Sequence, residues 1–345
     1  MEYRVLGRTG LKVSAYCFGV MTFGGVGRFS HMGQVQVEEA RRLLDQCFDA
    51  GVNLVDTANV YSNGVSEEIL GEALGDKRKD VLIATKFHSP MGTGPNDQGA
   101  SRHHIIQACE ASLKRLRTDY IDLYQAHNQD LLTAPEESMR ALDDLVRAGK
   151  VRYIGSSNLS GWYTMKSLAA SDRIGLTRYA SQQIQYSLLW RDAEDELLPL
   201  GLDQGVGALI WSPLASGYLS GKYRKPGENA ATRLSGDALS TVDDERARAI
   251  VDVLDDIATA RGVSAAQVAL NWVVRRAGVT SVIMGARTEA QLADNLAAAR
   301  WSLNDEEMER LTTVSKPPRR YPYYHQATFG AARNPVPPLQ APLSL

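Results

Sequence analysis

Eight short apolar runs recur along the 345-residue chain, and most are separated by stretches with helical spacing of apolar residues. Strands that alternate with helices favour a parallel sheet, and eight such units can close into a barrel. We therefore predict an α/β fold, a (β/α)8 TIM barrel forming a single domain over residues 1–345. The eight runs are residues 15–19, 52–56, 81–86, 121–127, 152–157, 179–183, 207–211 and 281–285.

Helical patterns and the two ends of the chain complete this prediction. Residues 3–14 form two extended runs around a Gly turn, which indicates an N-terminal β-hairpin. Residues 316–345 form a Pro-rich, aromatic C-terminal tail of the same domain, either disordered or packed near the barrel mouth. Apolar residues follow helical spacing within residues 36–51, 101–116, 135–150 and 289–300.

An open, doubly wound sheet is the alternative fold. It would need a Gly-rich dinucleotide fingerprint after its first strand. Residues 23–27, FGGVG, have the glycines but neither the spacing nor the following helix. The barrel is therefore favoured.

Charge and composition exclude several classes of protein. The formal net charge is −2, from 38 basic and 40 acidic residues, so nothing points to nucleic acid or an anionic membrane. No apolar run approaches the ~20 residues of a membrane span, and the N-terminus lacks a secretory signal. Cys17, Cys47 and Cys109 lie far apart, without metal-binding spacing. We expect a reduced, cytoplasmic protein without a metal, in which these cysteines pack.

Polar residues stand at the ends of the predicted strands, where a barrel of this kind builds its active site. Asp56, Lys86 and His127 end three successive runs, and Tyr61 follows five residues after Asp56. Each alone has an ordinary structural explanation as a cap, a surface lysine, a core histidine or a packing tyrosine. Their joint placement favours a site. The other polar strand-end residues are Thr22, Ser157, Asn158, Gln183, Ser212 and Arg287.

These four residues can transfer a proton. A free tyrosine has a pKa of ~10, and a lysine ammonium beside it lowers that pKa. A buried ammonium needs a carboxylate partner, which Asp56 can supply. His127 can orient a substrate oxygen through a hydrogen bond. A tyrosine acid of this kind suits carbonyl reduction, although the hydride must then come from a cofactor.

The motifs around these residues resemble the aldo-keto reductase family over nearly the whole chain. They include FGVMTFGG, GVNLVDTANVYSNGVSEEILGEAL, VLIATK, SLKRLRTDYIDLYQAH, ALDDLVRAGKVRYIGSSNLS, WSPLASGYLSGKY and VIMGARTEAQLADN. The resemblance implies a (β/α)8 barrel that reduces aldehydes or ketones to alcohols with NADPH. By the same resemblance Tyr61 is the general acid, Asp56 and Lys86 tune it, and His127 orients the carbonyl.

The resemblance also implies a cofactor site. Ser157, Asn158 and Gln183 match the residues that hold the nicotinamide carboxamide, and Trp211 matches the aromatic that stacks on the ring. The remaining matches toward the first strand and the pyrophosphate are Gly19, Met21, Thr22, Asp56, Ser212, Leu214, Gly217 and Lys222.

Residues 285–295, GARTEAQLADN, match the adenosine end of that site. Arg287 precedes a predicted helix, and a helix N-terminus with a guanidinium favours a phosphate. We therefore expect the 2′-phosphate there, and NADPH/NADP+ rather than NAD. Gly285, Gln291 and Asn295 complete this group.

The substrate pocket is expected to involve residues 88–101 and the tail, with Phe23, Tyr61, Phe87, His127, Asn128 and Trp190. The sequence shows no fixed anion site for a substrate, so a neutral aldehyde or ketone is expected, with bulky or sugar-like ketones among the candidates. Two alternatives stay open. One is a cofactor-binding regulatory subunit similar to potassium-channel β subunits, and the other is an aldolase that uses Lys86 as a Schiff-base nucleophile. The sequence leaves the oligomeric state open.

Overall fold

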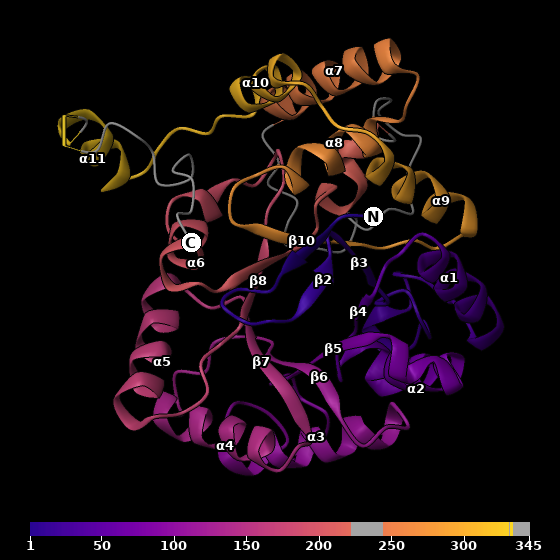
Figure 1. Cartoon of the computed structure of the whole chain (residues 1–345), viewed down its shortest axis with the longest axis vertical. Helices are drawn as coiled ribbons and strands as arrows, with labels where there is room; N and C mark the ends of the chain where they lie inside the picture. Colours follow the sequence, from indigo (N-terminus) through magenta and orange to yellow (C-terminus); the bar gives the residue numbers. More distant parts are fainter. Residues whose placement is uncertain (222–243, 331, 334–345) are drawn as a thin grey trace.

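Eight parallel strands form a closed barrel in the computed structural model, which describes residues 1–221, 244–330, 332 and 333 (Figure 1). Each strand pairs with the next along the chain, and the last strand closes the barrel by pairing with the first. The predicted (β/α)8 fold is confirmed. The strands are β3 (Tyr16–Gly19), β4 (Leu54–Asp56), β5 (Leu82–Phe87), β6 (Ile121–Ala126), β7 (Val151–Ser157), β8 (Ser181–Gln185), β9 (Gly207–Trp211) and β10 (Val279–Met284).

Helices surround the barrel, and their apolar faces pack against the outer side of the strands (Figure 1). Local signals fix several helix starts. Pro135 begins α4 and is followed by two glutamates, and Thr288 caps α9 by accepting a bond from the Gln291 amide. The helices are α1 (Val37–Asp49), α2 (Val65–Leu74), α3 (Arg102–Arg115), α4 (Pro135–Arg147), α5 (Gly161–Ile174), α6 (Leu197–Gln204), α7 (Asp244–Arg261), α8 (Ala265–Val274), α9 (Glu289–Ala297), α10 (Asp305–Val314) and α11 (Tyr323–Phe329).

The predicted N-terminal hairpin consists of β1 (Tyr3–Val5) and β2 (Lys12–Ser14), which pair antiparallel. Leu6 and Val13 are buried and pack with apolar residues of the barrel strands, such as Leu54 and Leu123. Between them Gly7 has φ +57°, and an added Cβ would lie 2.5 Å from the carbonyl oxygens of Ala180 and Gly205. Only glycine fits this close approach, and the hairpin thereby closes the N-terminal end of the barrel.

The three cysteines are free and buried, as their apolar surroundings predict. Burial raises the pKa of each thiol, so none is poised as a thiolate. Among the described residues, no helix combines the length and apolar character that a membrane span requires.

The described part of the tail contacts the segment that follows β8. Arg320 lies 3.3 Å from the carboxylate of Asp192, and the Tyr323 hydroxyl donates to Glu196 at 2.5 Å. Tyr321 and Phe329 are each 74% exposed. The tail therefore reaches the mouth side of the barrel through polar contacts and leaves its large apolar side chains in solvent, where α11 stands out from the helical ring (Figure 1).

Candidate active site

The structure brings together the four residues predicted for proton transfer. Asp56 ends β4, and Lys86 lies near the end of the neighbouring strand β5. Asp56 is in register with Ala84, so Lys86 lies two residues further toward the barrel mouth. The Lys86 ammonium donates to Asp56 Oδ1 at 2.5 Å, to the carbonyl of Thr57 at 2.7 Å and to the Tyr61 hydroxyl at 3.3 Å. His127 follows β6, and its ring packs edge-on against Tyr61 with 5.8 Å between centroids. One contiguous cluster results.

A short irregular segment after β4 places Tyr61 over this cluster. Ser62 and Asn63 adopt left-handed backbone conformations, with φ values of 50° and 56°. Such conformations cost about 1–3 kcal/mol each and persist only where the surroundings hold them. Ser62 is held because its hydroxyl donates to the carbonyl of Phe23 and accepts from the Gly25 amide, both at 3.0 Å. Strained turns thus carry Tyr61 off the strand axis and keep it over the barrel.

Burial and the ion pair set the protonation states in the cluster. Burial lowers the pKa of Lys86, but the charges and hydrogen bonds of Asp56 and Tyr61 together outweigh burial, so that this pKa is raised and the ammonium persists. Burial raises the pKa of Tyr61 by more than Lys86 lowers it, so the phenol stays protonated. Burial, aided by the Lys86 charge, holds the pKa of His127 well below 6.5, which keeps the imidazole neutral. The cluster therefore presents a protonated acid and a neutral hydrogen-bonding ring.

Two glutamines complete the surroundings of Asp56, and the sequence analysis named only one of them. Gln183 Nε2 donates to Asp56 Oδ2 at 2.7 Å, and Gln125 Nε2 donates to the same oxygen at 3.3 Å. Gln125 is fully buried, and its Oε1 has no partner among the described residues. It precedes His127 by two positions, so strand periodicity could have placed it on the same inward face.

The residues predicted to hold a nicotinamide carboxamide lie next to the cluster. Ser157 and Gln183 are paired in register on β7 and β8. The Ser157 hydroxyl is buried and without a partner in the described part of the chain. Asn158 donates to the carbonyl of His127 and accepts from the indole of Trp211, each at 3.0 Å. A buried hydroxyl with unused bonding capacity beside two amides fits a group that both donates and accepts.

The segment after β9 turns tightly through several left-handed backbone conformations. Ser212, Ser216 and Gly217 have φ values of 54°, 56° and 96° within the segment that includes η5 (Ala215–Ser220). The N–H groups of Ala215, Ser216 and Gly217 donate within the loop to Ser212 and Leu214, so the binding of a pyrophosphate by this loop stays a prediction. Leu214 belongs to the same loop, while Lys222 lies outside the described residues.

At the predicted adenosine end, Arg287 binds a neighbouring segment. Its guanidinium donates to the carbonyls of Met32 at 3.0 Å and His31 at 3.3 Å. The Arg287 amide donates to the side chain of Gln291, and the Asn295 side chain donates to the carbonyl of Gly285. These contacts order the approach to α9, whose N-terminus follows directly.

The first-strand residues of the predicted cofactor set border this region. Thr22 is buried, and its hydroxyl donates to the carbonyl of Ala286 at 3.0 Å. An added Cβ on Gly19 would lie 2.6 Å from the side chain of Ile283, so a larger residue would not fit. Met21 packs with Tyr61 in a small apolar cluster. The predicted cofactor residues at and after the ends of β3 and β10 thus follow two neighbouring strands.

Comparison with known proteins decides the family. A model of the aldo/keto reductase family matches residues 16–316. The chain belongs to the aldo-keto reductase family. This membership supports an oxidoreductase function with a cofactor of the NAD(P)H type.

Similar aldo-keto reductase relatives come from bacteria, fungi and plants. An uncharacterized oxidoreductase of Bacillus subtilis is 39% identical over 91% of this chain and 96% of its own length. The versiconal hemiacetal acetate reductase of Aspergillus parasiticus is 35% identical over 93% and 99%. A probable voltage-gated potassium channel subunit beta of Arabidopsis thaliana is 40% identical over 86% and 91%. The relatives therefore include both named reductases and channel subunits.

In this aldo-keto reductase, two of the predicted substrate-pocket residues have fully buried rings. Phe87 follows Lys86 on β5, and strand alternation turns its ring outward onto Tyr124, 4.9 Å away. Phe23 is fully buried and packs against Phe18. Both rings are therefore packed in the core, and their contact with a substrate stays a prediction.

Of the other four predicted pocket residues, Tyr61 and His127 belong to the proton-transfer cluster and the remaining two are accessible. Asn128 is exposed just after His127, and Trp190 is half-buried against the core. They remain candidates for contact with a substrate.

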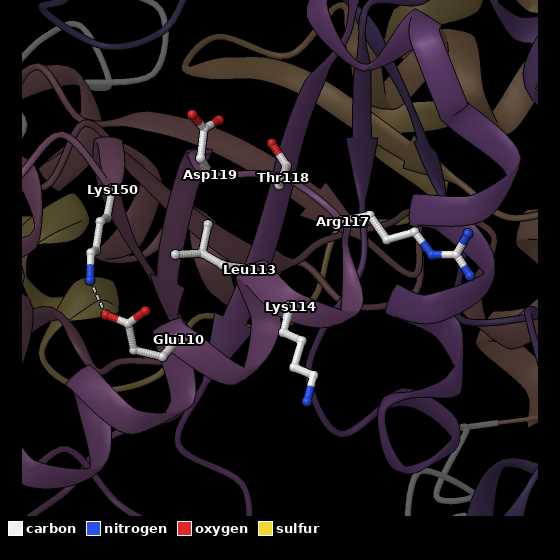
Figure 2. Close-up of a pocket in the computed structure, with 7 residues that line it drawn as sticks. All are labelled: Glu110, Leu113, Lys114, Arg117, Thr118, Asp119 and Lys150. Atoms are coloured by element: carbon white, nitrogen blue, oxygen red, sulfur yellow. Dashed lines mark hydrogen bonds and ion pairs between the residues drawn. The ribbon is translucent and has the colours of Figure 1, made fainter.

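The aldo-keto reductase barrel also has a surface pocket of about 470 Å³ far from this cluster (Figure 2). Figure 2 shows it where α3 leads into β6, lined by Leu113 and Thr118 and bordered by the Glu110–Lys150 ion pair. These residues precede the starts of β6 and β7, whereas the tetrad of Asp56, Tyr61, Lys86 and His127 lies at the carboxyl ends of the strands. The pocket is therefore separate from the candidate active site.

Proposed function

We propose that this aldo-keto reductase uses NADPH to reduce an aldehyde or ketone to an alcohol, with bulky or sugar-like ketones among the candidate substrates. The observation that carries the proposal is the contact of the Lys86 ammonium with both the Tyr61 hydroxyl and Asp56. It pairs a protonated acid with a cation that can stabilise the phenolate left after proton transfer.

Each residue of the cluster has a separate proposed role in the reduction of the substrate carbonyl. A bound nicotinamide supplies the hydride. Tyr61 donates its proton to the carbonyl oxygen, and Lys86 stabilises the resulting phenolate. Neutral His127 orients the same oxygen through a hydrogen bond. Asp56 keeps Lys86 charged in a buried site where an unpaired ammonium would be costly.

Several features of the chain support NADPH as the cofactor. The unused hydroxyl of Ser157, with Asn158 and Gln183, fits the nicotinamide carboxamide. Arg287 stands beside the N-terminus of α9, where a 2′-phosphate would gain from both the guanidinium and the helix dipole. Buried, unpaired cysteines support a reducing compartment such as the cytoplasm.

Replacement of Tyr61 by phenylalanine tests the proposed mechanism. Tyr61→Phe removes the acidic hydroxyl but keeps the ring, so kcat should fall at least about 100-fold while NADPH binding stays nearly unchanged. Turnover is measured from NADPH oxidation with a panel of aldehydes and ketones, and binding from fluorescence titration. Tyr324→Phe in the exposed tail is the matched control. Reduction by Tyr61→Phe at the unaltered rate would rule this mechanism out.

A cofactor-binding regulatory subunit is the second candidate, because potassium channel β subunits are among the relatives. The intact cluster of Tyr61, Lys86, Asp56 and His127 does not separate the two functions by itself. The carbonyl panel does separate them. NADPH that binds tightly but is not oxidised with any carbonyl would favour the regulatory function over the reductase.

A further inference from the structure

The segment between β3 and α1, residues 24–35, is fastened on both sides of the candidate active site. Next to Tyr61, the Gly25 amide donates to the Ser62 hydroxyl at 3.0 Å. At its other end the carbonyls of His31 and Met32 accept from Arg287. The segment is therefore held between the proposed proton donor and the proposed phosphate ligand.

The middle of this segment forms a wall beside Tyr61. The turn η1 (Gly27–Phe29) buries the ring of Phe29 edge-on against the Tyr61 ring, with 5.5 Å between centroids. Methionines 21, 32 and 91 pack around the same cluster. The surface beside the proton donor is therefore apolar and polarizable.

Arg28 adds a positive charge to this wall. Its guanidinium carbon lies 5.0 Å from the centre of the Phe29 ring, one packing step from Tyr61. Burial dominates the pKa shifts of Tyr61 and His127, and the Arg28 charge adds a lowering contribution to both, as expected for a nearby cation. Arg28 therefore belongs electrostatically to the candidate active site.

The charge of Arg28 is not compensated by the described residues. Its side chain is exposed, and in that part of the chain no carboxylate or carbonyl accepts a bond from it. Within the cluster the Lys86 charge is balanced by Asp56, and His127 is neutral. Arg28 therefore adds a positive charge beside Tyr61 that no described carboxylate balances, and its hydrogen-bond donors are available to a ligand.

We propose that Arg28 selects a carbonyl substrate that carries an anionic group, such as a carboxylate, on an apolar body. The apolar part would pack on Phe29 and the methionines while the anion meets the guanidinium. This inference rests on the proposed carbonyl reduction and narrows its substrate class. It differs from the neutral carbonyl expected from the sequence, where Arg28 stands in a glycine-rich stretch without any charge pattern.

A matched pair of substrates tests the assignment. The probes are 4-carboxybenzaldehyde and its neutral methyl ester, and the measured quantity is the ratio of their kcat/KM values with NADPH. The unmodified enzyme should favour the carboxylate, and Arg28→Gln should lower the ratio about fivefold by removing a partly exposed ion pair. Arg28→Lys should retain most of the preference. Added salt should reduce the ratio of the unmodified enzyme but not that of Arg28→Gln.

Two controls keep the outcomes distinct. Arg147→Gln makes the same change of net charge at the exposed C-terminal end of α4, and should leave the ratio unchanged. Turnover of the neutral ester tests the proposed reduction itself. If neither aldehyde is reduced although other carbonyls of the panel are, the anion assignment is overturned; if no carbonyl of the panel is reduced, the proposed function fails. If both are reduced with a ratio that Arg28→Gln does not alter, the reductase stands and the anion assignment is overturned.

Discussion

Asp56 is the residue on which the buried polar contacts of the candidate site converge. One carboxylate oxygen accepts from Lys86, and the other accepts from both Gln125 and Gln183. A buried carboxylate is stabilised only when its acceptors are satisfied. The two glutamines therefore hold Asp56 in the orientation in which it faces Lys86.

The two glutamines should differ in what their loss affects. Gln125→Leu removes a hydrogen bond to a buried charge, and we expect kcat to fall about tenfold with the dissociation constant of NADPH nearly unchanged. Gln183→Leu should lower kcat and also weaken the binding of NADPH, because Gln183 is the proposed ligand of the nicotinamide carboxamide. Steady-state kinetics and fluorescence titration of both variants provide the comparison. Equal weakening of NADPH in the two variants would contradict the division of roles.

The pH dependence of reduction follows from the shifted pKa values. Burial raises the pKa of Tyr61 above its ordinary 10.0, so the proton-donating form persists as the pH rises. Burial lowers the pKa of His127 well below 6.5, so the ring is already neutral near neutrality. We therefore expect kcat for carbonyl reduction to stay flat between about pH 6 and about pH 9. A basic limb with its midpoint in that interval, measured under saturating NADPH, would contradict these assignments.

The four residues Asp56, Tyr61, Lys86 and His127 could be found in the sequence because they stand together at or just after three successive strand ends, although each alone has an ordinary explanation. Gln125 could not be found in the same way, since a glutamine inside a strand suggests no role. Its partner Asp56 is 69 residues away, and only the barrel brings the two together. The sequence also did not identify Arg28 as a site residue, because only the packing of Phe29 on Tyr61 brings Arg28 to the site.

At the scale of elements, the link between residues 24–35 and α9 joins the two halves of the proposed ligand site. Arg287 holds the carbonyls of His31 and Met32, which belong to the loop that also packs on Tyr61. A 2′-phosphate at α9 would share this guanidinium with the loop. The choice of cofactor and the position of the substrate wall therefore depend on the same side chain.

Removal of that side chain should affect NADPH more than NADH. Arg287→Ala deletes a charged hydrogen-bond donor to the 2′-phosphate, so NADPH affinity should fall about 10- to 100-fold while NADH changes little. Parallel fluorescence titrations with the two cofactors measure the effect. Arg300→Ala, exposed in η7 (Ala298–Arg300) beyond the other end of α9, is the matched control. An equal loss of affinity for both cofactors would contradict the assignment of Arg287 as the ligand of the 2′-phosphate.

Sequence patterns predicted all eight barrel strands, with the largest displacement at β8. The prediction covered residues 179–183, whereas β8 spans Ser181–Gln185. Its polar composition hides the true limits, because its glutamines make specific contacts. Gln183 points inward to Asp56, while Gln182 donates to the carbonyl of Leu197 in α6. Apolar runs mark strands that are buried on both sides, and they fail where a strand serves a polar site.

At the scale of the whole molecule, the two ends of the barrel have different roles. Leu6 and Val13 of the hairpin close the N-terminal end, while the tetrad lies at the carboxyl ends of the strands. The count of eight strands predicts closure, but the closing register does not follow from local patterns. Ile283 pairs with Cys17 although most of the chain separates them. Packing at the closed end should therefore control stability without controlling chemistry.

A core substitution at the closed end tests this separation. Leu6 is 1% exposed, so Leu6→Ala leaves a cavity and should lower the free energy of unfolding by about 2–5 kcal/mol, as measured by urea titration. Because Leu6 lies at the opposite end from Tyr61, kcat/KM for carbonyl reduction should change less than about twofold below the unfolding transition. Val5→Ala, at a 48% exposed neighbouring position, should change neither quantity appreciably. Loss of activity in folded Leu6→Ala would mean that the hairpin also shapes the catalytic end. Stability and catalysis would then not be separated between the two ends of the barrel.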